Sequence, residues 1–172
     1  PIVLTLAGCA LCNDAVLEAV SGESGTFSTV GDPTEGALVI ASARAGLWKA
    51  DLEKAFPRVA ELPFDSDRKR MTTVHRPNPD LVPALLNPYQ DSRPDFFEPG
   101  HYLIITKGAV DSLLDVSTQV WAQGKTESLD ETWRDRILEA NNNLAKNGMR
   151  VLGLAFRQSD TAEAVERDLI FI

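Results

Sequence analysis

Apolar positions in the first third of the chain predict helical pieces on either side of a polar segment. The run at residues 3–12 is mostly apolar and is typical of a short buried helix. Residues 21–29 are rich in glycine and serine, which favours a loop or turn between short strands. We expect a further short helix from Trp48 to Ala55, because Pro57 cannot continue it.

The segment that begins at Asp32 carries the signals of a helix N-terminus. Asp32 suits the N-cap position and Pro33 suits the first helical position. Glu35 stands at the third position, where its carboxylate can close a capping box. We expect the helix to run to about Ala45, with Gly46 as its stop. The residues expected on its buried face are Leu38, Ala41 and Ala45.

Strand patterns dominate the middle and the end of the chain. Residues 59–64 and 69–76 predict two strands joined by the charged turn at residues 65–68. Residues 77–100 hold six prolines, so we expect an irregular surface excursion there. The further strands predicted from apolar β-forming residues lie at residues 101–106, 151–156 and 168–172.

Two more helices are expected between these strands, at residues 110–116 and after residue 128. Residues 128–131 have the pattern of a capping box, and Gly148 is the expected stop of the helix that follows. Strands paired mostly as antiparallel neighbours, with helices between them, predict an α+β fold in which a twisted, mainly antiparallel sheet is flanked by helices. The stripe expected on the second helix holds Trp133, Ile137, Ala140 and Leu144.

Composition places the chain among soluble single domains. Its 172 residues are 44% hydrophobic, which suits one domain spanning residues 1–172 with its own core. No apolar run approaches the length of a membrane-spanning helix, and there is no signal peptide. The chain ends on the apolar stretch Leu169–Ile172, from which we expect it to be a piece of a longer protein.

The charge balance excludes one class of partner and constrains another. A formal net charge of −8 argues against nonspecific nucleic-acid binding, which needs a basic face. The same charge repels phosphate ligands at long range, so a phosphate site would have to gather local positive charge. The candidate sources of that charge are Arg68, Lys69, Arg70, Lys107 and Arg150.

The two cysteines, Cys9 and Cys12, form a Cys-x-x-Cys pair. Such a pair can be redox-active or half of a zinc site. Zinc would need two more ligands, and the only histidines, His75 and His101, are distant in sequence. We therefore favour structural cysteines. A small hydrolase that uses either thiol as nucleophile is a further hypothesis, and it predicts loss of activity on alkylation.

Four motifs, taken in order, resemble the nucleotide-binding domain of a P-type cation-transporting ATPase. With the Cys-Ala-Leu-Cys-Asn-Asp segment at residues 9–14, the first motif is most similar to the bacterial calcium-pump branch. The chain has no Asp-Lys-Thr-Gly-Thr phosphorylation motif, so it is similar to one domain of such a pump. The motifs are Gly31–Leu38, Phe64–Met71, Lys107–Ala109 and Gly148–Leu152.

The resemblance implies a ligand, a larger protein that contains this domain, and partner domains within that protein. The ligand would be ATP, and Mg²⁺ would be held mainly by a phosphorylation domain outside this chain. That domain and an actuator domain would be partners in the same polypeptide. The chain would be the cytosolic domain of an integral membrane protein, monomeric as a fragment, with no catalytic residue of its own.

Several side chains have both a structural and a ligand-binding interpretation. Phe64 suits either a core position or an exposed stacking ring, and the resemblance implies that it stacks on adenine. Lys69 and Lys107 suit solvated surface positions or phosphate contacts, and the resemblance places Lys107 deep in the adenosine pocket. Gly108 lines the same pocket, where a missing side chain lets a ligand approach the backbone.

The remaining candidates come from the first and last motifs. Glu35 is either a capping residue or, by resemblance, an acceptor for the adenine amino group. Arg150 would contact phosphates and couple this domain to the phosphorylation domain, while Leu152 would form a wall of the pocket or belong to the core. Ser66 departs from the family, where several calcium pumps carry a phosphate-binding arginine, and Arg68 and Arg70 are the candidates to replace it.

Two functions from different classes follow. The first is an ATP-binding domain that presents the γ-phosphate to an aspartate elsewhere in a pump, and that alone binds ATP weakly and does not hydrolyse it. The alternative is a stand-alone ATP-sensing or protein-interaction module. No P-loop or dinucleotide glycine motif is present to support another nucleotide enzyme.

Overall fold

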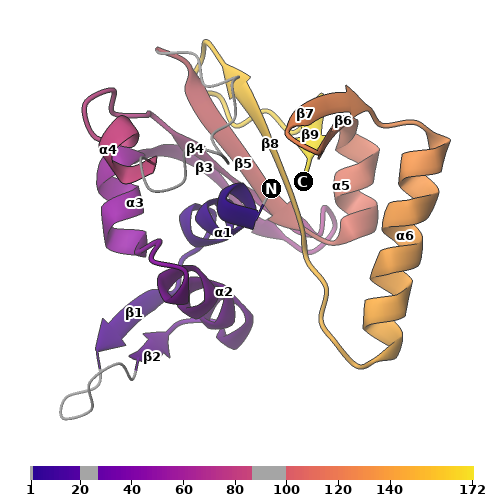
Figure 1. Cartoon of the computed structure of the whole chain (residues 1–172), viewed down its shortest axis with the longest axis horizontal. Coiled ribbons are helices and arrows are strands. Elements are labelled where there is room, and N and C mark those ends of the chain that lie inside the picture. Colours follow the sequence, from indigo (N-terminus) through magenta and orange to yellow (C-terminus); the bar gives the residue numbers. More distant parts are fainter. Residues whose placement is uncertain (1, 20–26, 87–99) are drawn as a thin grey trace.

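The computed structural model describes residues 2–19, 27–86 and 100–172, and a seven-stranded sheet forms its centre (Figure 1). The strand order is β3-β4-β5-β8-β9-β6-β7, and all neighbours are antiparallel except β6 and β9. The strands are β3 (Arg58–Asp65), β4 (Arg70–His75), β5 (Tyr102–Gly108), β6 (Ser117–Ala122), β7 (Lys125–Ser128), β8 (Gly153–Ser159) and β9 (Leu169–Phe171). A separate antiparallel pair joins β1 (Val16–Ala19) and β2 (Phe27–Val30).

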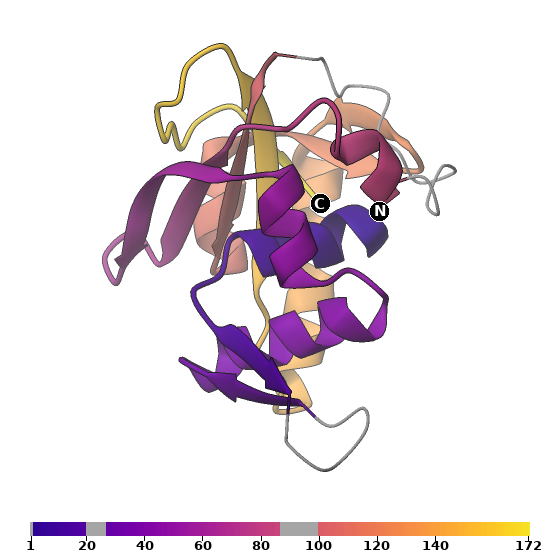
Figure 2. The same ribbon diagram turned by 90° about the vertical axis from the view of Figure 1, so that its left-hand side faces the viewer.

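Helices cover both faces of the large sheet. Helix α1 packs on β5 and β8 and contacts α2 and α3, while α5 packs on the opposite face with α6 outside it (Figure 1). Figure 2 looks onto the side that carries α3. The helices are α1 (Ile2–Leu11), α2 (Pro33–Arg44), α3 (Lys49–Ala55), α4 (Val82–Leu86), α5 (Val110–Val116) and α6 (Glu131–Lys146).

Alternation along β8 shows how the sheet divides the core in two. Leu154 and Phe156 are buried in the cluster under α1 and α3, whereas Ala155 between them belongs to the cluster under α5. Strand β5 contributes Leu103 and Ile105 to the first cluster. Since successive strand residues point to opposite faces, this pattern requires helices on both sides. The predicted α+β fold with a mainly antiparallel sheet is confirmed.

Most predicted elements lie where the sequence placed them, but one hairpin was missed. Strands β6 and β7 have polar residues at most exposed positions and carry no strong apolar alternation, so no element was expected there. The proline-rich segment at 77–100 contains the short helix α4 in its described part. The predictions for residues 21–26 and 87–99 lie outside the described residues.

The buried face of α2 differs from the prediction. Leu38 is only half-buried and Ala41 and Ala45 are exposed. The helix lies so close to β2 that a Cβ atom on Gly36 would stand 2.4 Å from the Thr29 hydroxyl oxygen. The face of the helix that turns toward β2 is therefore a different one from the expected face. The buried residues are Gly36, Val39, Ser42 and Ala43.

Both expected capping boxes are replaced by simpler caps. The Asp32 carboxylate accepts hydrogen bonds from the backbone nitrogens of Thr34 and Glu35, as an N-cap should, but the Glu35 side chain turns away from the helix start. At α6 the N-cap is Asp130, which accepts from the Trp133 nitrogen, rather than Ser128. Helix α6 therefore begins two residues later than a cap at Ser128 would place it.

The predicted stripe on α6 is only partly covered. Trp133 and Ile137 are half-buried and pack against the cluster under α5. Ala140 and Leu144 are exposed, because the second half of the helix extends beyond the sheet (Figure 1). The apolar pattern was correct for the first two turns and wrong for the last two.

His75 is a fully buried histidine of β4 that is held in one neutral form. Its Nδ1 donates to the Phe56 carbonyl oxygen at 2.8 Å, and its Nε2 accepts from the Thr73 hydroxyl at 2.8 Å. Burial lowers the pKa of this imidazole to about 4, although the hydrogen bond to Phe56 acts in the opposite direction. The folded state therefore excludes a proton that the unfolded chain takes up.

We predict that the stability of the chain falls as the pH is lowered from about 6.5 to about 4, because the unfolded state binds the His75 proton over this window. The expected contribution is on the order of 3 kcal/mol, measured by urea unfolding at a series of pH values. The His75→Gln variant should show a flatter profile. The His101→Gln variant, which keeps His75, should follow the parent, and an equal slope in the two variants would contradict the assignment.

Candidate functional site

A cavity of about 530 Å³ opens between the N-terminus of α2, the end of β5 and the segment that joins α6 to β8. This volume lies within the range of small-molecule pockets. Five segments of the sequence supply its walls. Four of them correspond to the four motifs, and the fifth contributes Asp14 from the Cys-Ala-Leu-Cys-Asn-Asp segment at residues 9–14. The lining residues are Asp14, Asp32, Thr34, Glu35, Phe64, Met71, Lys107, Gly108, Arg150 and Leu152.

Six of the seven site residues predicted from the sequence line this cavity, and Lys69 does not. Lys69 sits in the β3–β4 turn with a φ of 55°, and its Nζ lies 3.4 Å from a carboxylate oxygen of Asp111. Its side chain is exposed. The six lining residues are Glu35, Phe64, Lys107, Gly108, Arg150 and Leu152.

Phe64 is an exposed ring rather than a core residue, with 64% of its surface accessible. It stands near the end of β3, where the pairing with β4 is irregular between Leu62 and Asp65. The Asp65 carboxylate accepts from the backbone nitrogens of Asp67 and Arg68 and so shapes the turn that follows. A large apolar ring at the cavity mouth is available to a flat ligand.

Leu152 offers a second apolar surface to the same cavity. It precedes β8 instead of lying within it, and it remains 37% exposed. The interpretation of Leu152 as a core residue is therefore wrong. The cavity combines this aliphatic wall with the ring of Phe64, a composition that suits a flat, largely apolar ligand.

Lys107 and Glu35 form an ion pair at the inner end of the cavity. The Lys107 Nζ donates to Glu35 Oε1 at 2.7 Å, and the two side chains are 6% and 17% exposed. The second carboxylate oxygen accepts from the Asp14 backbone nitrogen at 3.1 Å. Lys107 lies within β5 rather than after it. The pair joins α2 to the sheet and cancels the lysine charge inside the cavity.

Gly108 has a structural role that the sequence did not reveal. A Cβ atom at this position would stand 2.4 Å from the Lys69 carbonyl oxygen and 2.5 Å from the Arg70 Cβ. The Ala109 backbone nitrogen donates to the same carbonyl oxygen at 3.0 Å. Glycine is therefore required here by the close approach of the β3–β4 turn, in addition to its position on the cavity wall.

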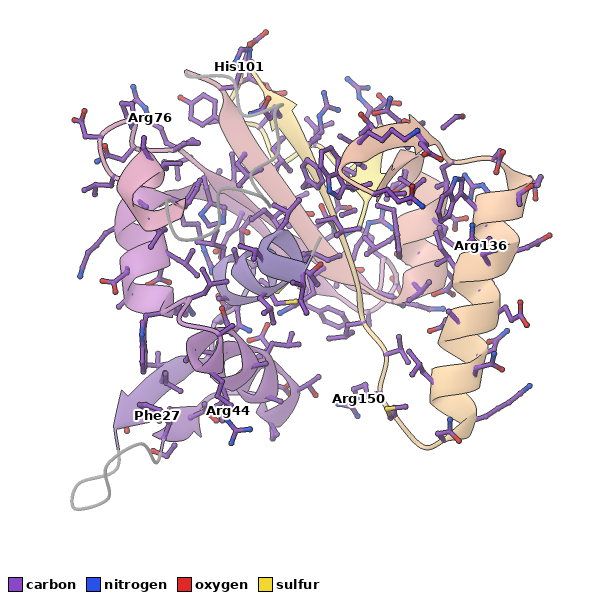
Figure 3. All side chains as sticks on the ribbon, in the orientation of Figure 1. Phe27, Arg44, Arg76, His101, Arg136 and Arg150 are labelled. Atoms are coloured by element: carbon purple, nitrogen blue, oxygen red, sulfur yellow. The ribbon has the colours of Figure 1, made fainter. Side chains whose placement is uncertain are left out.

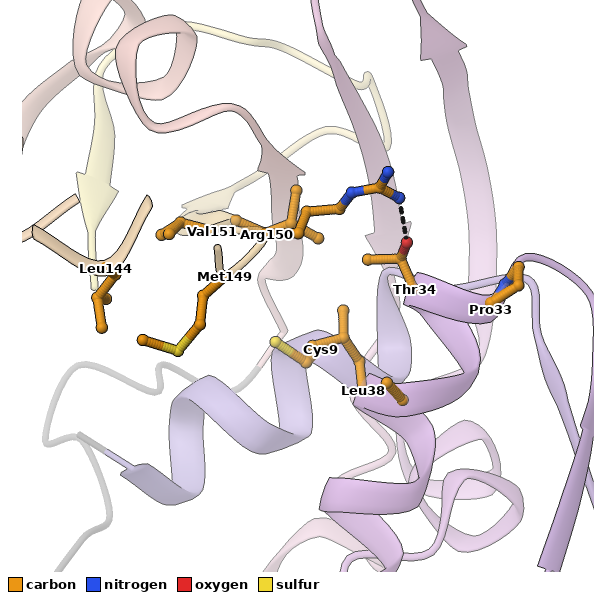
Figure 4. Close-up of a pocket in the computed structure, with 10 residues that line it drawn as sticks. Cys9, Pro33, Thr34, Leu38, Leu144, Met149, Arg150 and Val151 are labelled. Atoms are coloured by element: carbon orange, nitrogen blue, oxygen red, sulfur yellow. Dashed lines mark hydrogen bonds between the residues drawn. The ribbon is translucent and has the colours of Figure 1, made fainter. Parts of the chain in front are cut away.

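Arg150 projects from the segment between α6 and β8 toward α2 (Figure 3). Its guanidinium donates to the Thr34 hydroxyl at 2.6 Å (Figure 4). Both residues also line a second hollow of about 600 Å³. Backbone hydrogen bonds at the start of α2 lower the pKa of the Asp32 carboxyl, and the charge of Arg150 adds to this effect. Among the described residues Arg150 forms no ion pair.

The arginines of the second motif do not reach the cavity. Arg68 and Arg70 both bind the carboxylate of Glu166, in the connection between β8 and β9. The expectation that either replaces the missing arginine at Ser66 is therefore wrong in this conformation. The sequence predicts a local gathering of positive charge at the site. The cavity lining instead holds three carboxylates and two cations, so this prediction is wrong.

Burial makes both cysteines poor nucleophiles. It raises the pKa of Cys12 to about 11 and also raises the pKa of Cys9, although the charge of Lys107 acts in the opposite direction. Cys12 packs in the cluster under α1, and its Sγ lies 3.7 Å from the Met71 carbonyl oxygen. These thiols stay protonated at neutral pH, which agrees with structural cysteines.

Comparison with known protein families supports the resemblance that the four motifs indicate. The family described as P-type ATPase, cytoplasmic domain N, matches residues 2–172. The chain belongs to the P-type ATPases, as their N domain. A calcium-transporting ATPase of Bacillus cereus is 39% identical over 173 residues, which cover 98% of this chain and 16% of that protein.

Two further relatives also match most of this chain. A probable cation-transporting ATPase of Mycobacterium tuberculosis is 36% identical over 86% of this chain and 13% of its own length. A calcium-transporting ATPase of Bacillus subtilis is 29% identical over 95% of this chain and 16% of its own length. The N domain thus spans about one sixth of these proteins. Within the described ranges, no helix combines the length and hydrophobicity that crossing a bilayer requires.

Four cavity residues of this N domain were not predicted as site residues: Asp14, Asp32, Thr34 and Met71. Each lies in a segment that the sequence had already singled out, so position within a motif was the available signal. Asp32 is expected from the sequence only as the N-cap of α2. A residue that caps a helix can also face a cavity when the helix start forms its wall.

We predict that Glu35→Ala lowers the free energy of unfolding by about 3 kcal/mol, because it leaves the buried Lys107 ammonium without its partner. The double variant Glu35→Ala/Lys107→Met should recover most of this loss, since no buried charge remains. Chemical denaturation measures both values.

The matched control is the exposed pair of Lys54 and Asp51, whose nitrogen and oxygen are 2.9 Å apart. Asp51→Ala should cost less than about 1 kcal/mol. If Glu35→Ala loses no more stability than Asp51→Ala, the prediction is wrong, because burial of the Glu35–Lys107 pair would then add nothing to the cost of breaking it.

Proposed function

We propose that this N domain binds ATP by its adenosine end in the cavity and presents the γ-phosphate to an aspartate of a phosphorylation domain. The observation that carries the proposal is the convergence of four sequence motifs on one cavity that offers an exposed aromatic ring, an aliphatic wall and an inner ion pair. Residues 1–172 would act as a single nucleotide-binding domain on the cytosolic side of a membrane-embedded pump.

The adenine base would lie between apolar surfaces and meet one carboxylate. Phe64 would stack on the base, which contributes roughly 1–3 kcal/mol, and Leu152 would cover the wall beside it. Glu35 would accept a hydrogen bond from the adenine amino group. Each of its carboxylate oxygens accepts one bond already and has a further lone pair, so the contact does not require the ion pair with Lys107 to break.

The phosphates would leave the cavity on the side of Arg150. This guanidinium contacts only the Thr34 hydroxyl among the hydrogen bonds of the described residues, so it can turn to an anion at small cost. Lys107 is neutralised by Glu35 and would contribute mainly at the adenosine end. Lys69, exposed on the nearby turn, is a second cation that an extended triphosphate would meet.

Mg²⁺ would be held mainly by the phosphorylation domain. The three carboxylates of the cavity are engaged within the chain: Asp14 with Arg58, Asp32 with backbone nitrogens of α2 and Glu35 with Lys107. They do not form a free ligand set. When bound, the metal supplies charge neutralisation at the β- and γ-phosphates.

The contribution of this domain to catalysis would be positioning. Holding the adenosine end turns the encounter of γ-phosphate and aspartate into a step within one complex, once the domain moves toward its phosphorylation and actuator partners. Arg150 would help to neutralise phosphate charge in that closed state. Calcium is the cargo we propose, because relatives in two Bacillus species are named calcium-transporting ATPases.

We predict saturable ATP binding in a calorimetric titration of the 172-residue chain, weakened by more than about 1 kcal/mol in Phe64→Ala and in Lys107→Ala. The matched control is Val59→Ala, which removes an exposed aliphatic side chain from the same strand, away from the cavity. Val59→Ala should bind ATP like the parent.

A folded parent chain that does not bind ATP at millimolar concentration would reject the proposal. The alternative of a protein-interaction module would then explain the motifs better. Equal binding by Phe64→Ala and Val59→Ala would reject the stacking role while leaving ATP binding in place.

A further inference from the structure

The carboxylate of Glu166 is buried and contacts the β3–β4 turn, which follows the exposed ring of Phe64. Glu166 lies in the connection between β8 and β9, and its side chain is only 8% exposed. One carboxylate oxygen accepts from Arg68 and from the Thr72 hydroxyl, the latter at 2.8 Å. The other oxygen accepts from the Arg70 Nε at 2.8 Å. Three side chains of the β3–β4 hairpin therefore converge on one residue from a distant segment.

Arg68 links Glu166 to the backbone next to Phe64. While one of its terminal nitrogens binds Glu166, the other donates to the Pro63 carbonyl oxygen at 2.9 Å. Pro63 directly precedes Phe64. The guanidinium is planar and rigid, so fixing one edge of it fixes the direction of the other edge.

The second arginine secures the far side of the same turn. Arg70 donates to the Ser112 hydroxyl at 2.8 Å, and that hydroxyl donates to the Arg68 carbonyl oxygen at 2.6 Å. The turn is thereby tied to α5 as well as to Glu166. Thr72 extends the network into the sheet, because its hydroxyl also bonds the Thr106 hydroxyl at 2.9 Å.

The charge balance of the network depends on Glu166. Burial alone would raise the pKa of its carboxyl, but the hydrogen bonds from Arg68, Thr72 and Arg70 outweigh burial and hold the pKa below its usual range. Removing the charge would leave two guanidinium groups without a carboxylate partner. The turn would then lose its anchor to the connection between β8 and β9.

Few side-chain contacts orient the ring of Phe64. Phe64 is 64% exposed, so its direction follows from the backbone of the turn rather than from packing around the side chain. The Asp65 carboxylate shapes the residues after the ring, and Arg68 holds the residue before it. Of these two restraints, only the second depends on a group outside the hairpin.

We propose that Glu166 is a positioning residue for base stacking, acting through Arg68 on the backbone that orients Phe64. The inference rests on the proposed binding of adenosine by this cavity. It also explains why Arg68 and Arg70 do not serve as phosphate ligands: their guanidinium groups are committed to holding the turn.

The test compares AMP and ATP binding by calorimetry in the parent chain and in five variants, one of them a double variant. Glu166→Gln keeps the shape of the side chain and removes its charge. Arg68→Lys keeps the charge balance with Glu166 and loses the bond to the Pro63 carbonyl oxygen. Glu163→Gln, an exposed carboxylate in the same connection, is the control. Phe64→Leu, alone and combined with Glu166→Gln, completes a double-mutant cycle.

Glu166→Gln and Arg68→Lys should each weaken AMP and ATP by the same factor, about threefold to tenfold, because the defect lies at the base and not at the phosphates. Glu163→Gln should bind like the parent. In the Phe64→Leu background, Glu166→Gln should cause no further loss, since the ring through which it acts is gone. A purely structural role would instead produce an additional loss of similar size.

Several outcomes overturn the inference, and they separate it from the proposed function. If the parent chain and Phe64→Leu differ in affinity but Glu166→Gln and Arg68→Lys bind normally, Glu166 does not position the ring. Glu166 also does not position the ring if Glu166→Gln weakens the binding of ATP but not of AMP, or if its effect on affinity adds to that of Phe64→Leu. If the folded parent binds neither nucleotide, the proposed function fails and this inference falls with it. Arg68→Lys decides the question if Glu166→Gln does not fold.

Discussion

The register of three adjacent strands holds the site together. Met71 of β4 stands opposite Lys107 of β5, which in turn stands opposite Leu154 of β8. Because antiparallel pairing fixes neighbours residue by residue, the β3–β4 turn, the end of β5 and the start of β8 meet at one end of the sheet. A shift of one residue would send Lys107 to the other face. Gly108 permits the turn to approach closely enough for this arrangement.

Charge pairing completes the site and also limits what it can do. Glu35 reaches the sheet from α2 and neutralises Lys107, and Glu166 pairs with both Arg68 and Arg70. These contacts bind separate segments to one another, but they leave few cations for an anionic ligand. Under the proposed function, such a cavity would recognise a nucleotide mainly by its base, and the charge needed by the triphosphate would have to come largely from elsewhere.

The two hollows beside Arg150 show how one side chain can define a boundary. Thr34 and Arg150 meet across the opening between α2 and the segment before β8, and the walls on either side differ in character. The cavity that holds the motif residues is polar at its inner end, whereas the neighbouring hollow is lined by Cys9, Leu38, Leu144 and Met149 (Figure 4). Thr34, Arg150 and Leu152 line both spaces, so the hydrogen bond from Arg150 to Thr34 lies at their boundary.

Much of this protein was accessible from the sequence because its signals are local. The N-cap at Asp32, the turn after Phe64 and most strand positions depend on backbone sterics and hydrogen bonds within a few residues. The four motifs were enough to indicate the family and to name six residues that prove to share one cavity. The edge hairpin of β6 and β7 was missed because β7 is polar and mostly exposed and β6 has no regular apolar alternation, so neither strand carries a strong periodic signal.

Only the tertiary structure decided which charges pair and which faces are buried. Glu166 is separated from Arg68 by 98 positions and Glu35 from Lys107 by 72, and no local pattern joins either pair. The buried face of α2 was set by its contact with Thr29 of β2, which favoured Gly36 over Leu38. Local sequence specifies the elements, whereas partners and faces follow from how the elements pack, which is a property of the whole chain.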